Sequence, residues 1–299
     1  MISAADLDAR WGRAGAVVFN EKFGGAVAVL HATGATAVIA VQGAQVLSWI
    51  PNDAAEALWL SPSARLGTGK AVRGGIPVCW PWFGPHPSDA AKPAHGFVRA
   101  APWQVTGSAA SHDRARLVLG FDATGIDPAL WPHRARAEVE ITLDQNLTVA
   151  LTTANAGDTP FALTQALHTY FAVGDIADVA VTGLAGRCYI DQLDHSTRPV
   201  ETGDIHIKGE IDRIYQATPG DVVLKDASLN RRIRVAKTGS LSTVVWNPGT
   251  EKAARLGDMG PDGHRRMICV ETANAGDDVE TLAPGARHRL SAKFSIERP

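Results

Sequence analysis

The stretch Ala137-Glu138-Val139-Glu140-Ile141-Thr142-Leu143 decides the fold class of this chain. Apolar and polar residues alternate along it without exception. An extended backbone places the apolar side chains on one face and the polar ones on the other, whereas a helix would spread both sets around its circumference. The stretch therefore predicts a β-strand with one face on a core and the other towards solvent.

Comparable short apolar segments occur along the rest of the chain, at residues 26–30, 35–41, 117–121 and 147–151. Turn-forming Gly, Pro, Asn and Asp residues separate them. Only residues 4–13 and 250–257 have a pattern typical of short helices. Many strands without alternating long helices favour an all-β sandwich or barrel over βαβ units. With no linker or low-complexity segment, we expect one domain over residues 1–299.

Composition limits the class of partner. The chain has 299 residues, of which 45% are hydrophobic and 20% charged, with a formal net charge of −2. This composition is typical of a soluble globular protein, and the small net charge gives no reason to expect nucleic acid or an anionic membrane as partner. An anionic ligand would have to be bound by a few placed residues. We expect a monomer that binds a small molecule.

Neither the cysteines nor the N-terminus indicates an extracellular protein. Cys79, Cys188 and Cys269 are odd in number and widely spaced, which predicts no disulfide framework and no CxxC metal site. The first ten residues lack the apolar region of a secretory signal. No apolar stretch approaches the length of about 20 residues that spans a bilayer. We therefore expect a cytoplasmic protein.

Several common catalytic motifs are absent. Gly67-Thr68-Gly69-Lys70 completes neither a dinucleotide fingerprint nor a P-loop. The histidines show no metal-ligand spacing, and there is no Gly-x-Ser-x-Gly nucleophile elbow. We therefore expect no metal and no cofactor.

The segment of residues 72–85 is too rich in Pro, Gly and large aromatics to form a regular strand or helix. Irregular loops on a β scaffold commonly carry binding residues, although these aromatics could equally fill the core. This segment contains Arg73, and a second Gly-containing loop contains Arg99. Two such arginines could clamp a phosphate or carboxylate, or could simply be solvated surface residues.

Two titratable residues lie in apolar surroundings. His168 is flanked by apolar and aromatic residues, as a hydrogen-bonded core histidine would be. Glu271 ends an apolar run, where an acid is costly to bury unless it is partnered or functional. A structural salt bridge would also explain it. From the residues alone, catalytic and structural roles stay open for both.

Together, these segments resemble the aldose 1-epimerase (galactose mutarotase-like) superfamily, in particular its hexose-6-phosphate branch. The motifs that carry the resemblance occur in the family's order over about residues 40 to 275: Gly43-Ala44-Gln45-Val46-Leu47-Ser48-Trp49, Leu58-Trp59-Leu60-Ser61, Arg73-Gly74-Gly75-Ile76-Pro77-Val78-Cys79-Trp80-Pro81-Trp82-Phe83-Gly84, His95-Gly96-Phe97-Val98-Arg99, Ala166-Leu167-His168-Thr169-Tyr170-Phe171, Asp212-Arg213-Ile214-Tyr215, Trp246-Asn247-Pro248 and Cys269-Val270-Glu271-Thr272.

The resemblance implies a large twisted antiparallel β-sandwich and a glucose-6-phosphate 1-epimerase activity on a hexose 6-phosphate. It implies His168 and Glu271 as the catalytic pair. The substrate-binding positions that it implies are Arg73, Ala94 through its backbone, His95, Arg99 and Asp212.

Chemistry suggests a role for each group. Glu271 would take the proton of the C1 hydroxyl while His168 protonates the ring oxygen, so no metal, nucleotide or covalent intermediate is needed. Arg73 and Arg99 would grip the phosphate, with Lys70 as a helper. His95 would bond the ring or C1 oxygen, and Asp212 the sugar hydroxyls. A wall for the apolar face of the sugar would come from Trp80, Trp82 or Phe83.

Two other functions remain open from sequence. A mutarotase for an unphosphorylated sugar would not need the Arg73 and Arg99 pair. A non-catalytic sugar-phosphate-binding protein could share the fold, because folds host many functions. Such a protein would have no need for the acid–base pair His168 and Glu271.

Overall fold

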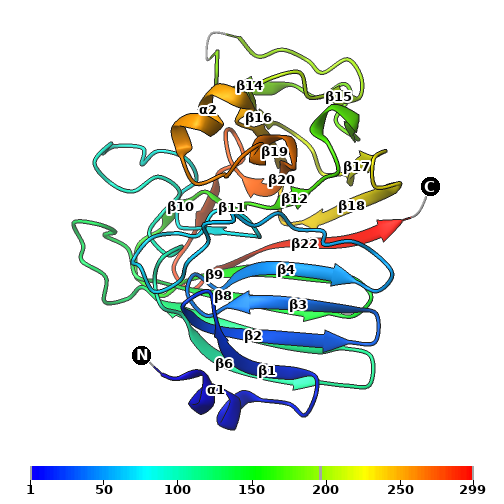
Figure 1. Cartoon of the computed structure of the whole chain (residues 1–299). Helices are drawn as coiled ribbons and strands as arrows, with labels where there is room; N and C mark the ends of the chain where they lie inside the picture. The colour runs from blue at the N-terminus through cyan, green and yellow to red at the C-terminus, as the bar shows by residue number, and fades with distance from the viewer. Residues whose placement is uncertain (1, 195–196, 298–299) are drawn as a thin grey trace.

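The computed structural model describes residues 2–194 and 197–297. This part of the chain is almost entirely β, as the alternating stretch predicts, and its sheets are antiparallel (Figure 1). Within it, no helix is long and apolar enough to cross a membrane.

The largest sheet among the described residues has nine strands and forms one layer of the sandwich. Its order is β15-β13-β17-β18-β22-β9-β8-β7-β6. The bounds in that order are Ile205–His206, Val179–Thr182, Val222–Asp226, Arg231–Thr238, Arg287–Glu297, Leu147–Asn155, Ala135–Leu143, Ala115–Asp122 and Gln104–Ala110.

A four-stranded and a seven-stranded sheet form the opposing layer. The first contains β1 to β4, at Val17–Lys22, Gly25–Ala32, Ala35–Ala40 and Gln45–Pro51. The second has the order β14-β16-β19-β20-β11-β5, with β12 also on β20. Its bounds are Tyr189–Asp191, Ile211–Tyr215, Ser242–Asn247, Met267–Asn274, Gln165–Leu167, Val78–Cys79 and Tyr170–Ala172. The short strands β10 (Phe161–Leu163) and β21 (Glu280–Leu282) pair separately.

The alternating stretch occupies β8, between β7 and β9. Its odd-numbered residues are buried, and its even-numbered residues are exposed or half-buried. The buried set joins one large core with residues of the other two sheets, including Trp49 of β4 and Val270 of β20. Figure 1 shows β1 to β4 lying over the part of the large sheet that contains β6 to β9. The predicted β-sandwich is therefore confirmed.

The seven-stranded sheet is buried on both faces, so every residue of β20 is buried. Ile268 and Val270 point into the large core. Cys269 and Ala273 point to the other face and pack in a second apolar cluster with Ala253. Glu271, in phase with this second set, therefore lies on the face away from the large core.

Two short α-helices match the sequence expectations at 4–13 and 250–257. Helix α1 covers Ala4–Trp11, begins at the side-chain cap Ser3 and packs on β1. Helix α2 covers Gly249–Leu256 and contributes Ala253 to the second cluster. The 3₁₀ turns η1 and η2 cover Ile176–Asp178 and Gly263–Arg265.

The segment of residues 72–85 is irregular as expected, apart from β5. Its backbone runs against neighbouring chain segments at a spacing that only glycine permits. A Cβ on Gly75 would lie 2.0 Å from the carbonyl oxygen of Val46, and one on Gly96 in the facing loop 1.8 Å from that of Trp80. These glycines hold the irregular loops rigidly against the sheets.

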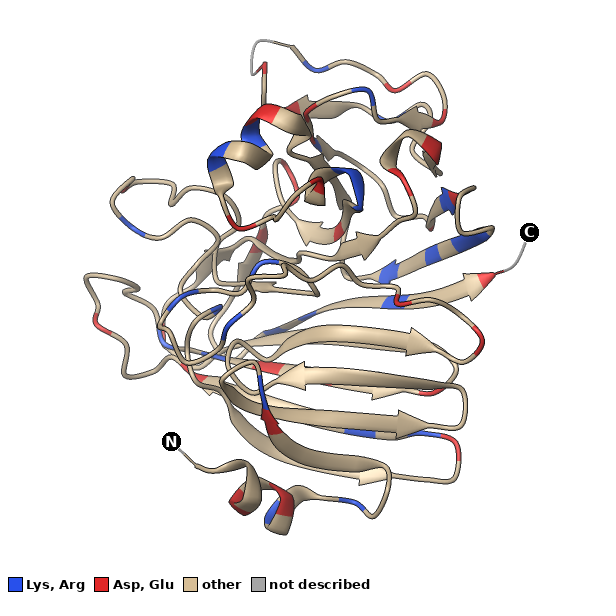
Figure 2. Cartoon of the chain, viewed as in Figure 1, with Lys and Arg blue, Asp and Glu red and all other residues tan. Residues whose placement is uncertain are grey.

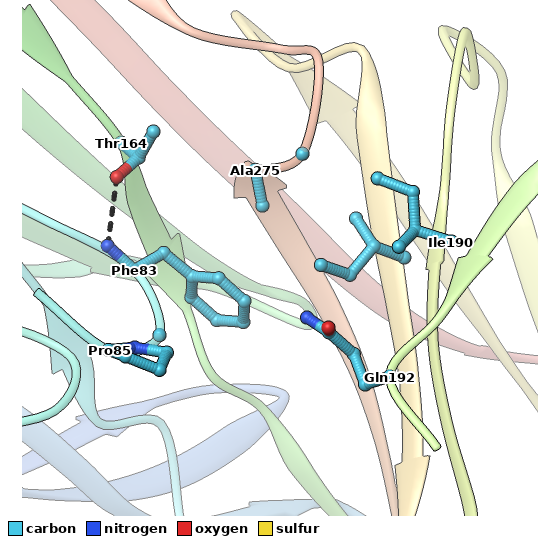
Figure 3. A pocket seen from close by; sticks show the side chains of 9 residues that line it. Phe83, Pro85, Thr164, Ile190, Gln192 and Ala275 are labelled. Atoms are coloured by element: carbon cyan, nitrogen blue, oxygen red, sulfur yellow. Dashed lines mark hydrogen bonds between the residues drawn. The ribbon is translucent and has the colours of Figure 1, made fainter. Parts of the chain in front are cut away.

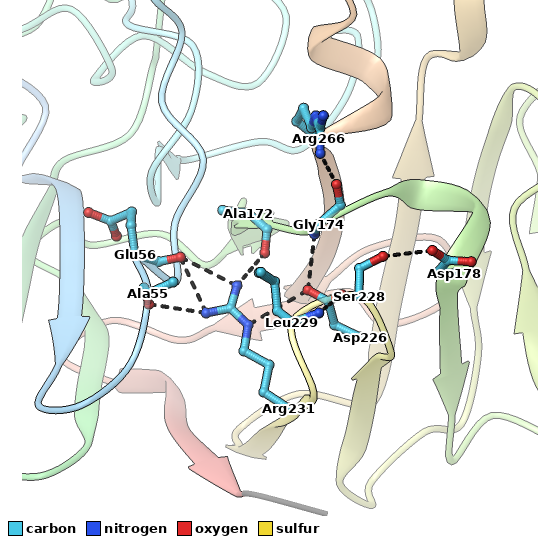
Figure 4. Close-up of polar contacts among 10 residues, drawn as sticks. All are labelled: Ala55, Glu56, Ala172, Gly174, Asp178, Asp226, Ser228, Leu229, Arg231 and Arg266. Carbon is cyan, nitrogen blue, oxygen red and sulfur yellow. Dashed lines mark hydrogen bonds and ion pairs between the residues drawn. The ribbon is translucent and has the colours of Figure 1, made fainter.

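A buried arginine ties three parts of the chain together (Figure 4). The Nη atoms of Arg231 donate to the carbonyl oxygens of Ala55, Glu56 and Ala172, at 2.7–3.3 Å. Its Nε lies 3.7 Å from Oδ2 of Asp226, whose carboxylate accepts the N–H of Gly174. This network joins the β17–β18 hairpin to the loop that follows β4 and to the end of β12 with the residue Gly174 after it.

Charge is mixed over the surface. Figure 2 shows acidic and basic residues interspersed on α2, the loops and the ends of the strands, while β2, β3 and β4 carry neither. This distribution agrees with the expectation that a bound anion would rely on individual residues.

Candidate active site

His168 and Glu271 face one another because of strand register. Strand β11 pairs Leu167 with Thr272, and β12 pairs Tyr170 with Cys269 on the same strand β20. The two ladders share one register, which sets His168 opposite Glu271. Directly opposed side chains on neighbouring antiparallel strands lie close together.

The two side chains meet in a nearly water-free position. Nδ1 of His168 lies 3.2 Å from Oε1 of Glu271, and the side chains are 10% and 1% exposed. The contact does not have hydrogen-bond geometry: among the described residues, His168 Nδ1 and Glu271 Oε2 are both buried without a hydrogen-bond partner. Buried polar atoms in this condition are uncommon and need an explanation. A hydrogen-bonded core histidine is therefore the wrong interpretation of His168.

Burial acts on both groups in the direction that removes charge. It raises the pKa of Glu271 well above its usual value, and the nearby Asp212 carboxylate adds to this effect. It also lowers the pKa of His168 well below its usual value, helped by the positive charges of Arg99 and Arg73. Both groups are therefore driven towards their neutral forms.

His95 lies on the loop that faces the catalytic segment. Its ring centroid is 5.6 Å from that of His168. Its Nδ1 accepts the N–H of Gly84 at 3.2 Å, which leaves Nε2 as the protonated ring nitrogen. Burial, together with the charge of Arg99, lowers the pKa of His95 to about 3. His95 is therefore a neutral hydrogen-bond donor at neutral pH.

Arg73 is held in place by a residue that the sequence does not single out. Its Nε donates to Oδ1 of Asp258 at 2.7 Å, and its side chain is a quarter exposed. The backbone carbonyl of Asp258 is in turn held by the hydroxyl of Ser61. Arg73 also lies within electrostatic range of Tyr170 and His168.

Arg99 reaches the same site from the other loop. Its Nη2 donates to the carbonyl oxygen of Ala94 at 2.6 Å. Its charge affects the pKa of His95, His168 and Glu271, which places it within electrostatic range of all three. Both arginines therefore converge on the His168–Glu271 pair.

Asp212 comes from β16, two strands away from Glu271. Its Oδ2 lies 3.9 Å from Nζ of Lys252 on α2, and Lys252 is anchored by Glu210 at 2.8 Å. The six side chains of Arg73, His95, Arg99, His168, Asp212 and Glu271 thus come together from segments far apart in sequence.

Of the three aromatic residues that could supply a wall for the sugar, two fill the core. Trp80 and Trp82 are buried in the large core, because the loop turns them inward. Instead, Tyr170 stacks on His168 with ring centroids 4.8 Å apart, and Trp246 stands edge-on at 6.1 Å. Only Phe83 is as expected: it packs against the ring of His95 at 4.8 Å.

A cavity of about 260 Å³ lies beside this site. Figure 3 shows Phe83, Ile190 and Ala275 around it, with Thr164 and Gln192 as its polar side chains. Phe83 also contacts His95, so the cavity adjoins the site without including the His168–Glu271 pair.

Lys70 lies on an exposed loop. In the part of the chain that the structure describes, no hydrogen bond or ion pair ties the Lys70 side chain to a residue of the site. Cys79, Cys188 and Cys269 are all free thiols. Cys269 belongs to the site: donor atoms of His168, Cys269 and Glu271 lie within 4.8 Å of one another, a set that could hold a metal ion.

Residues 26–295 match the family model of aldose 1-epimerase. The chain belongs to this family. A curated relative in Escherichia coli K12 is 38% identical over 253 residues, which cover 84% of this chain and 84% of the relative. A second, in Cenchrus ciliaris, is 35% identical over 263 residues, which cover 85% of this chain and 79% of the relative. Both are provisionally named glucose-6-phosphate 1-epimerases.

Solved structures of the aldose 1-epimerase family share the fold. A crystal structure from Salmonella typhimurium, provisionally described as a mutarotase, superposes with a TM-score of 0.88 at 32% identity. The alignment covers 95% of this chain and 94% of that chain. The family that the sequence motifs resemble is therefore the correct one.

Proposed function

We propose that this chain is a glucose-6-phosphate 1-epimerase in which His168 and Glu271 exchange protons with the sugar. One observation carries the proposal. The two side chains oppose one another at 3.2 Å in a buried position, each has a polar atom without a hydrogen-bond partner among the residues that the structure describes, and two arginines lie within electrostatic range of them. The names of the E. coli and C. ciliaris relatives support the substrate.

Anomer exchange requires the bond between C1 and the ring oxygen to break and re-form. Glu271 removes the proton of the C1 hydroxyl while His168 protonates the ring oxygen, and the bond opens to an aldehyde. Rotation about C1–C2 exposes the other carbonyl face, and the reverse transfers close the ring. Each acid–base contribution is typically worth about 10²–10⁴ in rate.

The buried setting favours the ring-open complex. An imidazolium beside a carboxylate carries the same number of protons as an imidazole beside a carboxylic acid, and ring opening converts the first state into the second. Because burial raises the pKa of Glu271 and lowers that of His168, it stabilises the state reached after opening. The same pair then returns the protons during closure.

The phosphate also affects the acid. Arg99 and Arg73 are among the groups that lower the pKa of His168. A phosphate bound between these arginines offsets their charge and makes the imidazolium easier to form. We assign Asp258 and the carbonyl of Ala94 to orienting Arg73 and Arg99, respectively. This couples phosphate recognition to the proton transfer.

The remaining groups position the sugar. Nε2–H of His95 is the donor available to the ring or C1 oxygen, since Nδ1 is held by Gly84. Asp212 accepts hydrogen bonds from sugar hydroxyls, and Lys252 keeps its carboxylate oriented. Tyr170, Trp246 and Phe83 supply apolar surface for the sugar ring.

Substrate choice tests the proposal. Arg73→Met and Arg99→Met should each lower kcat/KM for glucose 6-phosphate at least about tenfold, since a hydrogen bond to a charged group is worth about 1.5–3 kcal/mol. Free glucose should be affected far less. Arg65→Met, at an exposed site, is the matched control and should behave like the wild type. Equal losses on both sugars would show that Arg73 and Arg99 do not bind the phosphate, and faster exchange of free glucose than of glucose 6-phosphate by the wild type would show that an unphosphorylated sugar is the substrate. Binding without any exchange would indicate a sugar-phosphate-binding protein.

We also propose that the enzyme acts in the cytoplasm as a monomer. The proposed proton transfers and phosphate binding require no residue from a second chain. Light scattering on the purified protein should give the 31.6 kDa of a single chain, and a mass twice as large would contradict this.

A further inference from the structure

Cys269 is a third side chain with a donor atom on the face that carries His168 and Glu271, and burial raises the pKa of its thiol well above the usual value. It precedes Glu271 by two residues on β20, so both side chains project to the same side of the sheet. The thiol is fully buried and lies in the apolar cluster beside Tyr170 and Trp246. Acid–base exchange with a sugar requires no thiol here.

The donor atoms of these three residues form a compact set. The imidazole nitrogen, the thiol sulfur and a carboxylate oxygen all lie within 4.8 Å of one another. Zinc–sulfur and zinc–nitrogen bonds of about 2.3 and 2.0 Å place neighbouring donors of a tetrahedral ion about 3.5 Å apart. Small side-chain rotations would therefore bring the set to coordination distance.

Two of the donor groups have unused capacity. Nδ1 of His168 and Oε2 of Glu271 are buried without hydrogen-bond partners among the residues that the structure describes. These atoms belong to side chains that are at least nine-tenths buried. A cation between them would satisfy both atoms, which a purely apolar neighbour could not do.

The donor types select the kind of cation. Cysteine, histidine and glutamate together suit Zn²⁺ and the softer Cd²⁺, and they do not suit Mg²⁺ or Ca²⁺, which prefer oxygen ligands. Arg73 opposes a cation near Cys269, but its charge is balanced by Asp258 at 2.7 Å. Asp212 adds a negative charge within electrostatic range of both Cys269 and Glu271.

We propose that His168, Cys269 and Glu271 form a three-ligand site for a thiophilic divalent cation, with Zn²⁺ as the physiological candidate, and that the bound cation inhibits the enzyme. The ion would bind the thiolate, the imidazole and the carboxylate, and the thiol proton would leave to solvent. Inhibition rests on the proposed function, because the cation would occupy both proton-transfer groups. Cation binding itself does not rest on it.

Metal-free protein titrated with Cd²⁺ alone tests the site, because a Cd²⁺–thiolate bond has an ultraviolet charge-transfer band. The reference protein is Cys188→Ser, which removes the exposed thiol and leaves the site intact. The Cys188→Ser protein should bind one equivalent of Cd²⁺, and the charge-transfer band should appear as the ion binds. In the Cys188→Ser/Cys269→Ser protein the band should disappear. The Cd²⁺ dissociation constant should rise at least about 10–100-fold, the typical effect of losing even an outer-shell partner.

Glu271→Gln in the same Cys188→Ser background serves as a second variant if Cys269→Ser does not fold. It should keep the band, since the thiolate remains, but bind Cd²⁺ at least about tenfold more weakly. A band that persists without Cys269 would assign the ion to Cys79 and overturn the proposal. An absent band in the Cys188→Ser protein would overturn it as well.

The activity assay separates this proposal from the proposed function. Zn²⁺ should inhibit anomer exchange by the Cys188→Ser protein, and sugar phosphate should relieve the inhibition. A protein that binds Cd²⁺ as described but never exchanges anomers would contradict the proposed function and leave the cation site standing. Active protein that Zn²⁺ does not inhibit would contradict the inhibitory role.

Discussion

Two buried pairs of oppositely charged residue types, Arg231–Asp226 and His168–Glu271, have different hydrogen-bonding surroundings. Arg231 and Asp226 are tied to other segments: the guanidinium Nη atoms donate to three backbone carbonyls and the carboxylate accepts backbone N–H groups, so that of this pair only Arg231 Nε is buried without a hydrogen-bond partner among the described residues. His168 and Glu271 lie 3.2 Å apart, and in the described part of the chain both keep a buried polar atom without a hydrogen-bond partner and neither side chain is hydrogen-bonded to another segment.

The difference separates a pair that holds segments of the fold together from a pair for which we propose proton transfer. Arg231 cannot lose its proton under ordinary conditions, and its bonds join three segments of the fold. His168 and Glu271 can both change protonation state, and their unused atoms lie among residues that could contact a sugar. What sets His168 and Glu271 apart from Arg231 and Asp226 is that both are titratable and that no hydrogen bond ties either side chain to another segment of the described chain.

The largest effect on activity is expected at the His168–Glu271 pair. His168→Gln and Glu271→Gln should each lower kcat for anomer exchange by about 10²–10⁴, because each removes a proton-transfer group. The free energy of unfolding, measured in urea, should fall little, since neither side chain holds other parts of the fold. Turnover within a factor of about three of the wild type would remove that residue from the mechanism.

At the Arg231–Asp226 pair we expect a large effect on stability and a small one on activity. Arg231→Met leaves Asp226 buried without its cation and three carbonyls without donors, so unfolding should become easier by about 3–5 kcal/mol. The folded protein should retain kcat within about threefold. The neighbouring exposed Arg232→Met is the matched control and should change stability by less than about 0.5 kcal/mol. A variant as stable as this control would show that the Arg231 network is not structural.

A smaller effect should follow when an arginine of the site loses its anchor. Asp258→Asn keeps the size of the side chain but weakens its bond to Arg73, so KM for glucose 6-phosphate should rise about tenfold with little change in kcat. Asp262→Asn, on the exposed turn nearby, is the control. A change in kcat alone would show that Asp258 does not act through phosphate binding.

The smallest effect concerns pH. The pKa of Glu271 is raised in the folded protein, so its contribution to stability is fully present below the unfolded value near 4.5 and is lost as pH rises through the folded pKa. The Glu271→Gln protein has no titratable group at this position, so its stability does not fall in this way as pH rises. From about pH 4.5 upwards its stability should therefore increase relative to that of the wild type in urea titrations. A constant difference across this range would contradict the raised pKa.

Much of the fold is predictable from local pattern. The alternation at residues 137–143 gave β8 and its buried face, and the short segments gave β2, β3, β7 and β9. Strand pairing is not local: nothing near His168 indicates that β11 and β12 share one register on β20. Without this pairing, the residues alone left both catalytic candidates open.

The motifs predicted the residues that the fold brings together around His168 and Glu271, but not the residues that hold their side chains in place. Asp258 follows α2 in a stretch without any sequence signal, although it holds Arg73 at 2.7 Å. Composition also left open which of Trp80, Trp82 and Phe83 fills the core, and the structure places Trp80 and Trp82 there. Tyr170 and Cys269 lie within the family motifs. Their position on the same face as His168 and Glu271 depends on the strand register.

The most direct test of the central claim is the rate of anomer exchange in glucose 6-phosphate, measured by NMR exchange spectroscopy with catalytic amounts of protein. With the wild-type chain, the α–β exchange rate should rise in proportion to protein concentration. With the folded double variant His168→Gln/Glu271→Gln, it should fall to the rate of buffer alone. No acceleration by the wild type, or equal acceleration by the double variant, would contradict the account.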